Sequence, residues 1–535
     1  MNKIIALYRN EMSRIFRKTS HLILIGLLVM MCIALPLLVN AGKNLFLGDM
    51  GYNLDSLTEM KQQNEKQISI MKASLENSKT GDYVPEDPFG DTDYQEAEIL
   101  RLEKENLRID YLLTAGYENN VVQHNQDFIV DASYDMIDYM ESAEAIKNLP
   151  ASEQTAWYQE YLAFCEESIT VIRSFPKTRD FRSYIDLLIK ESALLSQNPD
   201  YQAHKEFLDM DIDNLELIYL ADPTGGTDGT YSYSAALEVA RSISGLNDFI
   251  EGGCEYTYNA FSGETIVPIS PAKRTFYLDS IKVMEHQIAT NTFPSGVATV
   301  LANLSKNMVQ SVGKFFVGVL VLMVAGSTIS QEIATGSIKS LIIAPVRRWK
   351  ILTAKILSVL SVLALSLFLM SVISTLSCSA VFGAGSLVDY VYANAHSVGS
   401  IPYMIYDVLS AFVKSVDLLV LALFALLLST TLRNTAFAVA ASIGAYFSIS
   451  LLSAMLISLP IPRQMWMDFM PFMNLDLNND IFRFSMYTYP SDLSNELAEA
   501  LFSVRPGLLF TSIYLVVLIT IMVLGMYDSF SKRDI

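Results

Sequence analysis

Few side chains in this sequence stand in an arrangement that could carry out catalysis. The chain contains no G-x-x-x-x-G-K-[ST] phosphate loop and no G-x-S-x-G nucleophile motif, so neither type of hydrolysis is indicated. The histidines are scattered, with no pair at metal-ligand spacing, and they are His21, His124, His204, His286 and His396. The sequence therefore predicts a chain that is not an enzyme and carries no metal or cofactor of its own.

One acidic run has the spacing that opens a calcium-binding loop. Asp209, Asp211 and Asp213 would be its first, third and fifth positions. The sixth and twelfth positions are then Asn214 and Leu220, where such a loop needs glycine and glutamate. An acidic helix end exposed to solvent is the favoured interpretation.

The most patterned charges lie in the segment 331–355. Glu332 is followed by five basic residues, which are Lys339, Arg347, Arg348, Lys350 and Lys355. These groups can form charge-assisted hydrogen bonds with a protein partner, or they can hold the segment to anionic lipid. Gly336 and Pro345 are expected to bend or end helices inside it.

The composition indicates a membrane body that carries an acidic insert. The 535 residues are 51% hydrophobic, yet the formal net charge is −19. Residues 42–309 hold 44 acidic and 20 basic residues, a net charge of −24, so the remainder has a net charge of +5. No basic patch accompanies the aromatic residues of the insert, which argues against nucleic acid as a partner.

Uncharged runs predict six membrane-spanning helices, and the fold class is therefore an all-α polytopic membrane protein. The spans are expected at 21–41, 310–330, 356–383, 412–432, 435–459 and 506–528. The expected cytoplasmic segments are an amphipathic interfacial helix at 1–20, the loop 331–355 and a tail at 529–535. The expected extracellular segments are 42–309, 384–411 and 460–505.

The basic residues decide this topology. Among the short segments that flank the spans, they concentrate in those assigned to the inside, which predicts a multi-pass protein of a bacterial cell membrane with both termini in the cytoplasm. A cleaved signal peptide is the alternative for the N-terminus. The uncharged run from Leu22 to Gly42 is longer than a usual signal core and lacks an A-x-A-like cleavage site, so an uncleaved span is favoured.

The insert is predicted to be mainly helical. Two rough heptad patterns fit an antiparallel hairpin in which Asn64 and Asn106 set the register, although the two helices could instead pack elsewhere. Further helical patterns occur at 134–147, 153–174 and 181–196, and a short β-hairpin is expected within 252–276. Cys165 and Cys254 could pair if the insert faces an oxidising space, but two cysteines are no disulfide framework.

The expected spans have no charged residue near their middle. Transporters driven by protons or ions usually keep ionisable groups at depth, so this chain would need an external source of energy. Lys414 and Asp417 come closest, one helical turn apart near the outer end of the fourth span. They are candidates for an outer gate, and mutual pairing at the interface is the alternative.

The loop then suggests a family. Glu332, Gly336, Lys339, the pair Leu341-Ile342, Pro345, Arg347-Arg348 and Lys355 follow one another in a pattern that resembles the segment between spans two and three of ABC-2-type transporter permeases. The amphipathic N-terminal helix and the turn Leu432-Arg433-Asn434 fit the same family. The resemblance covers the six-span body and not the insert.

The resemblance implies the permease subunit of an ATP-driven exporter. Such a subunit pairs with a second copy or a homologous permease, and with cytoplasmic ABC ATPase subunits that hold the ATP and magnesium. The segment 331–350 would be the coupling helix that contacts the ATPase, through Glu332, Gly336, Lys339, Pro345, Arg347, Arg348 and Lys350. A peptide or a hydrophobic compound is the expected cargo.

Two other interpretations stay open. The outline of one span, a long helical outer domain and an ABC-2-like membrane end is also similar to the YhgE/Pip proteins, which resemble surface receptors or secretion accessories and act without an ATPase. The acidic insert could alternatively bind a cationic antimicrobial peptide that its charge attracts. The coupling pattern favours the exporter.

Overall fold

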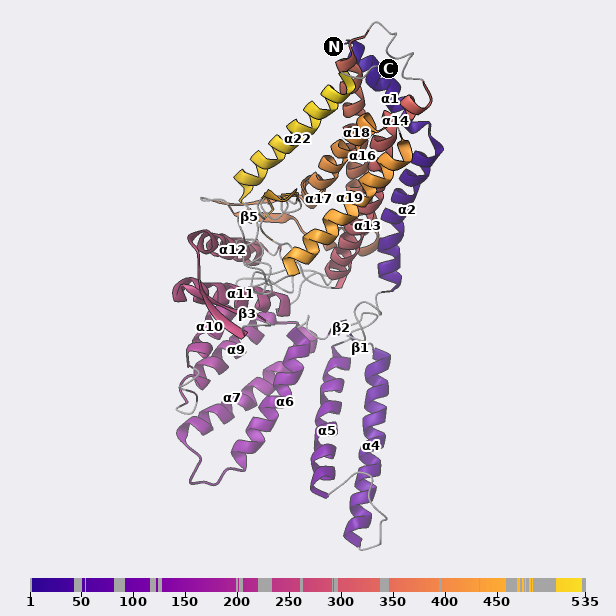
Figure 1. The fold of residues 1–535 in the computed structure, drawn as a ribbon. Coiled ribbons are helices and arrows are strands. Elements are labelled where there is room, and N and C mark those ends of the chain that lie inside the picture. The colour runs from indigo at the N-terminus through magenta and orange to yellow at the C-terminus, as the bar shows by residue number, and fades with distance from the viewer. Residues whose placement is uncertain are drawn as a thin grey trace. The chain divides into compact units, whose positions relative to one another are not determined.

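The structure is a computed structural model of the chain, and it is mostly helical. It describes residues 2–531 with gaps, the longest of which are 43–50, 81–91, 116–121, 220–232, 337–345, 459–468 and 485–506. The chain folds into two compact units, whose helices are labelled in Figure 1. Unit 1 comprises Met1–Gly42, Phe249–Val283 and Ala298–Ile535, and unit 2 comprises Lys43–Asp248 and Met284–Val297.

Unit 1 holds the long apolar helices. Its helices are α1 (Asn2–Phe16), α2 (Thr19–Ala41), α13 (Val297–Thr328), α14 (Ser330–Ala334), α16 (Arg348–Phe382), α17 (Tyr403–Lys414), α18 (Val416–Thr431), α19 (Thr435–Ser458) and α22 (Leu508–Ser531). Its two antiparallel strand pairs are β3 (Cys254–Asn259) with β4 (Gly263–Pro268) and β5 (Tyr390–Ala393) with β6 (Val398–Ile401). The pair β3–β4 confirms the hairpin expected within 252–276.

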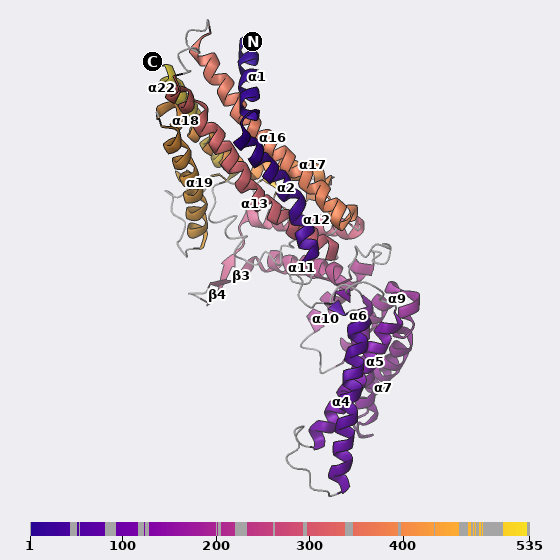
Figure 2. The ribbon, with the colours of Figure 1, turned by 90° about the vertical axis from the view of Figure 1, so that its right-hand side faces the viewer.

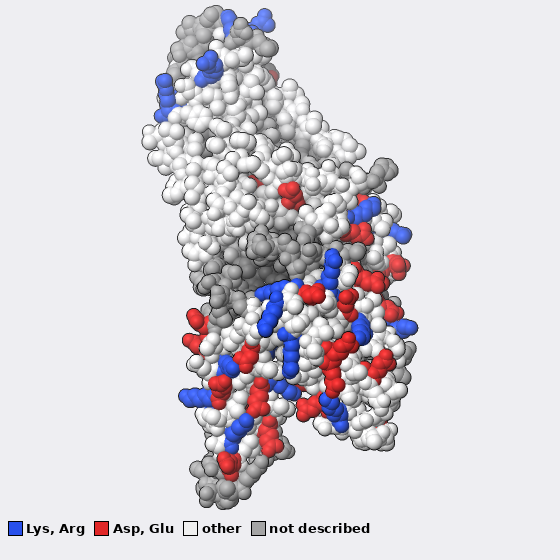
Figure 3. All heavy atoms as spheres, turned by 180° about the vertical axis from the view of Figure 1, so that it is seen from behind, with Lys and Arg blue, Asp and Glu red and all other residues white. Residues whose placement is uncertain are grey.

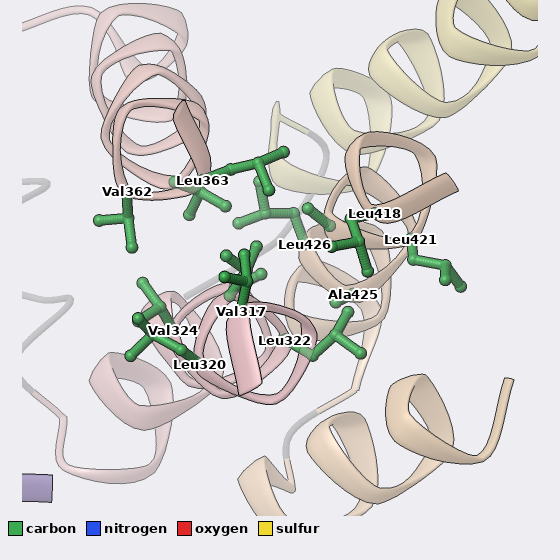
Figure 4. Packing of buried hydrophobic residues seen from close by; sticks show 14 of the residues in the cluster. Val317, Leu320, Leu322, Val324, Val362, Leu363, Leu418, Leu421, Ala425 and Leu426 are labelled. Carbon is green, nitrogen blue, oxygen red and sulfur yellow. The ribbon is translucent and has the colours of Figure 1, made fainter. Parts of the chain in front are cut away.

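The core of unit 1 is an apolar cluster between α2, α13, α16 and α18. Figure 4 shows Val317 and Leu320 of α13 facing Val362 and Leu363 of α16, with Leu426 of α18 beside them. α2 runs alongside α16 in Figures 1 and 2. The helices carry mainly leucine, valine, isoleucine and alanine, so close van der Waals packing holds them together.

Four helices of unit 1 are long and apolar enough to cross a membrane. They are Thr19–Ala41, Leu301–Ala334, Arg348–Phe382 and Leu508–Ser531, among the residues that the structure describes. α17 and α18 form a fifth candidate if they are taken together, with a bend of 43° between them. A mostly helical chain with four or five candidate spans is consistent with the expected all-α membrane protein.

Two of these helices start earlier than the expected spans. α13 begins at Val297 rather than at 310, and α16 begins at Arg348 rather than at 356. The second span was expected to start just before Lys314, and the third just after Lys355, where the uncharged run begins. Lys306 and Lys355 are buried, at 2% and 1% exposure, so neither charge ends its helix.

The surfaces of the two units differ in charge. The face of unit 1 in Figure 3 is almost free of charged side chains, apart from lysine and arginine at one end. Both ends of the described chain lie at that end (Figure 1). Unit 2 carries both signs over its surface in the same view.

Unit 2 is built from helices of moderate length. They are α4 (Leu54–Thr80), α5 (Thr92–Thr114), α6 (Phe128–Lys147), α7 (Ala156–Ile172), α8 (Phe175–Thr178), α9 (Phe181–Leu195), α10 (Lys205–Tyr219) and most of α11 (Tyr233–Gly252). β1 (Gly51–Tyr52) pairs with β2 (Val122–Gln123), and α12 (Pro271–Thr290) contributes residues to both units. The expected helical patterns at 134–147, 153–174 and 181–196 correspond to α6, α7 and α9.

α4 and α5 form the predicted antiparallel hairpin. Asn64 Nδ2 donates to Asn106 Oδ1 at 3.1 Å, so the two predicted register positions meet. The pairs on either side, Lys61–Asp110 and Lys72–Glu103, show that the helices run in opposite directions. A buried apolar cluster lies between them, in which the heptad positions Met71, Leu75, Ile99 and Leu102 are joined by Ile68.

Two half-buried carboxylates lie among α6, α7 and α9, and tyrosine hydroxyls bind them. Tyr184 donates to Asp135 at 2.6 Å, whereas Tyr139 and Tyr161 donate to Glu191 at 2.7 and 3.0 Å. Burial raises the pKa of Asp135 to about 7, and it also raises the pKa of Glu191. Among the described residues neither carboxylate has an ion-pair partner.

The cysteines are free thiols. Cys165 is buried in α7 and Cys254 is partly buried at the start of β3. The structure therefore does not show the disulfide that the sequence allowed between them. The segment 222–232, which its glycine, proline and aspartate content predicts to be a loop, lies outside the described residues.

Candidate functional site

The segment after α13 begins with an inward-pointing carboxylate. α14 is a single short helical turn, and within it Glu332 is 3% exposed. Its Oε1 accepts from Nζ of Lys355 on α16 at 2.8 Å, and the guanidinium of Arg14 on α1 also binds it. A buried carboxylate needs such partners, because an isolated charge away from water is very unfavourable.

Lys355 joins three segments of the chain. Besides Glu332, its ammonium binds Oε1 of Glu11 on α1 at 2.9 Å, and the carbonyl oxygen of Thr328 lies at 3.4 Å. Arg14 closes the network through Oε2 of Glu11 at 3.1 Å. α1, α14 and the start of α16 are thus held together by two carboxylates and two cations, which we call the inner charge cluster (Glu11, Arg14, Glu332 and Lys355).

A further hydrogen bond extends this attachment to the end of α1. Lys18 Nζ donates to Oε1 of Gln331 at 2.6 Å. Burial lowers the pKa of Lys18, and the neighbouring Arg14 acts in the same direction. The chain just after α1 is therefore attached to Gln331, the residue before Glu332.

Gly336 ends the described part of this segment with a left-handed backbone. Its φ of +70° is a conformation that side chains with a Cβ rarely adopt, so glycine is the suitable residue there. Nothing lies within 4 Å of the position that a Cβ would take. Lys339 and Pro345 lie outside the described residues.

The remaining predicted contact residues lie around the start of α16. Arg347 is exposed and precedes the first turn, whereas Nη1 of Arg348 donates to the carbonyl of Ser531 at the end of α22, at 3.0 Å. Nζ of Lys350 lies 5.5 Å from the ring centroid of Trp349. Three cations at a helix N-terminus oppose the helix dipole, so helix stability does not explain them.

Lys414 and Asp417 lie on either side of the break between α17 and α18. Both are attached to α13. Lys414 Nζ donates to Oε1 of Gln310 at 2.9 Å, and Asp417 Oδ2 pairs with Lys314 Nζ at 2.9 Å. The same ammonium of Lys314 donates to the carbonyl of Lys414 at 2.6 Å, so it bridges the break.

A second buried charge cluster was missed by the sequence reasoning. Lys306 of α13 and Asp407 of α17 pair at 2.7 Å, with side chains only 2% and 1% exposed. Lys306 escaped attention because the second span was counted from 310, which left it in the insert. Its helical spacing from the apolar Ala302 and Val309 was a signal that it faces the core.

The structure thus brings the predicted site residues into separate groups. Glu332 is internal, Arg347 is exposed beside Trp349, which was not predicted, and Lys414 and Asp417 lie on other helices. In the part of the chain that the structure describes, no group of three or more His, Cys, Asp or Glu could hold a metal ion.

Comparison with known proteins gives one match. Residues 275–535 are similar to a family described as a protein of unknown function, DUF2705. The matched part contains α13 to α22, and therefore Glu332, Lys355, Lys306 and Asp407, but not α1 or most of unit 2. No curated protein and no solved structure matches the chain.

Proposed function

We propose that this chain is the membrane-spanning permease subunit of an ABC-2-type exporter, and that the segment 331–350 receives the motion of a separate ATPase. One observation carries the proposal. The segment connects two candidate membrane helices, it is anchored by the inner charge cluster, and it presents the exposed Arg347 and Trp349 beside that anchor.

The proposed topology has six spans, namely α2, α13, α16, the pair α17–α18, α19 and α22. α19 has 24 residues with no charged side chain, and a helix of that length extends about 36 Å, which suffices to cross a bilayer. The basic end of unit 1, which holds both ends of the described chain, would face the cytoplasm of the cell. Unit 2 would then be extracellular.

The anchor gives the segment a mechanical role. Closure of the ATPase subunits on ATP would move the surface on which the segment sits. Because Glu332, Glu11 and Lys355 bind one another, α1 and the start of α16 would move with it as one block. ATP shifts the inward and outward states only if contacts with the ATPase differ between them, and exposed groups such as Arg347 are suited to make those contacts.

This assigns different roles to residues that the sequence grouped together. Glu332 is a positioning residue, because it is buried and its charge is used within the chain. Arg347, together with Lys350 and the neighbouring Trp349, would touch the ATPase. ATP and magnesium would be bound by the partner subunits, and a second permease copy or a homologue would complete the complex.

The test is purification from the native membrane with an affinity tag, followed by identification of what remains bound. We expect an ATPase with a phosphate-loop motif, whose activity the complex stimulates. Arg347→Glu should abolish that stimulation while the protein still inserts, whereas the control Arg17→Glu, also an exposed arginine at this end of unit 1, should retain it. Equal stimulation in both variants would refute the coupling role, and absence of any ATPase would favour an accessory protein of the YhgE/Pip kind.

A further inference from the structure

The two halves of the bent pair α17–α18 are attached to the rest of unit 1 by different means. α18 lies in the apolar cluster through residues such as Leu418, Leu421 and Leu426. The buried residues of α17 are Tyr403, Asp407, Ser410 and Ala411, of which Ala411 belongs to that cluster. Where α17 meets α13 and α16, the contact is therefore mainly polar.

The facing sides of α13 and α16 are polar as well. Nζ of Lys306 is bound by Asp407 Oδ2 at 2.7 Å, by Ser374 Oγ at 2.6 Å and by Thr375 Oγ1 at 3.0 Å. It also lies 5.7 Å from the ring centroid of Tyr403. Asp407 in turn accepts from Thr375 at 3.0 Å and from Gln310 at 3.2 Å.

A proline and a bend set α17 apart from its neighbours in the chain, with Lys314 bridging the bend and Lys414 at the end of α17 binding Gln310. Pro402 precedes it, and at Ser415 the chain bends by 43° into α18. Its other face carries exposed apolar residues, among them Ile405 at 54% and Leu409 at 45%. A short helix with a break at each end can swing as a unit, provided that the contacts on its inner side can be broken.

We propose that Lys306 and Asp407 form a latch, which holds α17 closed against α13 and α16 and which must separate when the outer end of the permease opens. A polar contact is suited to this task, because both charges are solvated once it opens. A buried charge that has lost its partner is strongly unfavourable, so arrangements between the closed pair and two solvated charges are sparsely populated. The contact therefore has two stable states, closed and open. The latch itself does not depend on the proposed function, whereas its use as the outer gate of an exporter does.

A native thiol reports on the latch. Cys378 of α16 is fully buried, with its Sγ 3.6 Å from the hydroxyl of Ser305, the residue before Lys306. It lies one helical turn beyond Ser374 and Thr375, on the same face. Any movement that separates Lys306 from Asp407 should therefore open a path for solvent to this cysteine.

The experiment uses the full chain in detergent with Cys32, Cys165 and Cys254 replaced by serine, and measures the rate at which a water-soluble maleimide labels Cys378. We expect Asp407→Asn to label faster by about tenfold or more, because Lys306 then loses its buried counter-charge. The control is Asp279→Asn, the same replacement in the more exposed pair with Lys282, and it should label at the original rate.

A charge swap separates the latch from general misfolding. In the double variant Lys306→Asp with Asp407→Lys, the pair can form again between the same helices, so slow labelling should return. Labelling of the swap as fast as that of Asp407→Asn would overturn the proposal, as would unchanged labelling of Asp407→Asn.

The link to transport is tested with the same reporter in the complex with its ATPase. If the latch is the outer gate, a non-hydrolysable ATP analogue should change the labelling rate of Cys378 with the native pair in place. A labelling rate that does not change with the ATP analogue, together with slow labelling of Cys378 in the charge-swap variant, would support the latch and refute its role as the gate. Absence of an ATPase would contradict the exporter assignment without affecting the first two variants.

Discussion

Units 1 and 2 keep carboxylates in their interiors in different ways. In unit 1, Glu332 and Asp407 each bind the ammonium group of a buried lysine. In unit 2, Asp135 and Glu191 bind tyrosine hydroxyls and, among the described residues, no cation. The first arrangement pairs opposite charges, whereas in the second no cation offsets burial, which favours the protonated carboxyl.

The difference has a consequence for what each region can do. A carboxylate with a cation beside it stays ionised and fixes the relative position of the helices that supply the two charges. Such pairs lie where unit 1 joins α1 to the coupling segment, and where α17 meets α13. A carboxylate without a cation has nothing to offset the effect of burial, which raises its pKa, as Asp135 illustrates even though the hydrogen bond from Tyr184 acts in the opposite direction.

The largest effect is expected when the cation of the inner charge cluster is removed. Lys355→Met leaves Glu11 and Glu332 buried, with the half-exposed Arg14 as their remaining cation. Breaking a buried pair in this way destabilises a protein by about 3–5 kcal/mol. Thermal unfolding in detergent measures the loss, and Lys350→Met, little more than one helical turn away, should lose less than about 1 kcal/mol because Lys350 is less buried. Equal losses of stability in Lys355→Met and Lys350→Met would show that the buried ion pairs of Lys355 do not stabilise the protein more than a partly exposed lysine does.

This cluster also shows how far the sequence could predict the site. The loop pattern identified Glu332 and Lys355, but it treated their charges as available to a partner. Glu11 and Arg14 are hundreds of residues away along the chain, and nothing local indicates that they complete the pairs. Burial of a charge depends on which distant helix supplies the opposite charge, and one sequence does not contain that information.

The helical hairpin was predictable for the opposite reason. α4 and α5 are adjacent in the chain, and their heptad patterns determine which faces meet, so Asn64 and Asn106 followed from spacing. Lys306 is an intermediate case. Its apolar neighbours at helical spacing indicated a buried face, but its partner Asp407 lies on a short helix that the sequence assigned to an outer loop.

A second pair of variants compares the buried pair Lys306–Asp407 with the inner charge cluster. Lys306→Met alone should lose on the order of 3 kcal/mol, since Asp407 keeps hydrogen bonds from Gln310 and Thr375 but loses its cation. Adding Asp407→Leu should recover most of that loss, because apolar groups of similar size can replace a buried ion pair at little cost. A double-mutant cycle by thermal unfolding measures the coupling, and additive losses would contradict a direct pair.

Stability of unit 2 should depend on pH through Asp135. Its pKa is about 7 in the folded chain and about 3.9 when unfolded, so the folded state binds the proton more tightly. This contribution therefore favours folding at low pH and is lost as the pH rises from about 4 to about 7. Hydrogen exchange of α6 and α9 in the full chain, compared at pH 5 and pH 8, should show the change. Asp135→Asn should reduce the difference in hydrogen exchange between the two pH values, whereas Asp186→Asn, at an exposed position, should leave it unchanged.

The smallest effect is expected where ion pairs are exposed. Lys72 and Glu103 bridge α4 and α5 at 2.7 Å, closer than Lys355 and Glu332 are to one another, yet their side chains are 57% and 47% exposed. Water and salt screen such a pair, so Lys72→Gln should change the free energy of unfolding by less than about 0.5 kcal/mol. Hydrogen exchange of the α4–α5 hairpin at low and high salt measures this value. A loss as large as that of Lys355→Met would mean that distance, and not burial, decides the strength of the ion pairs in this protein.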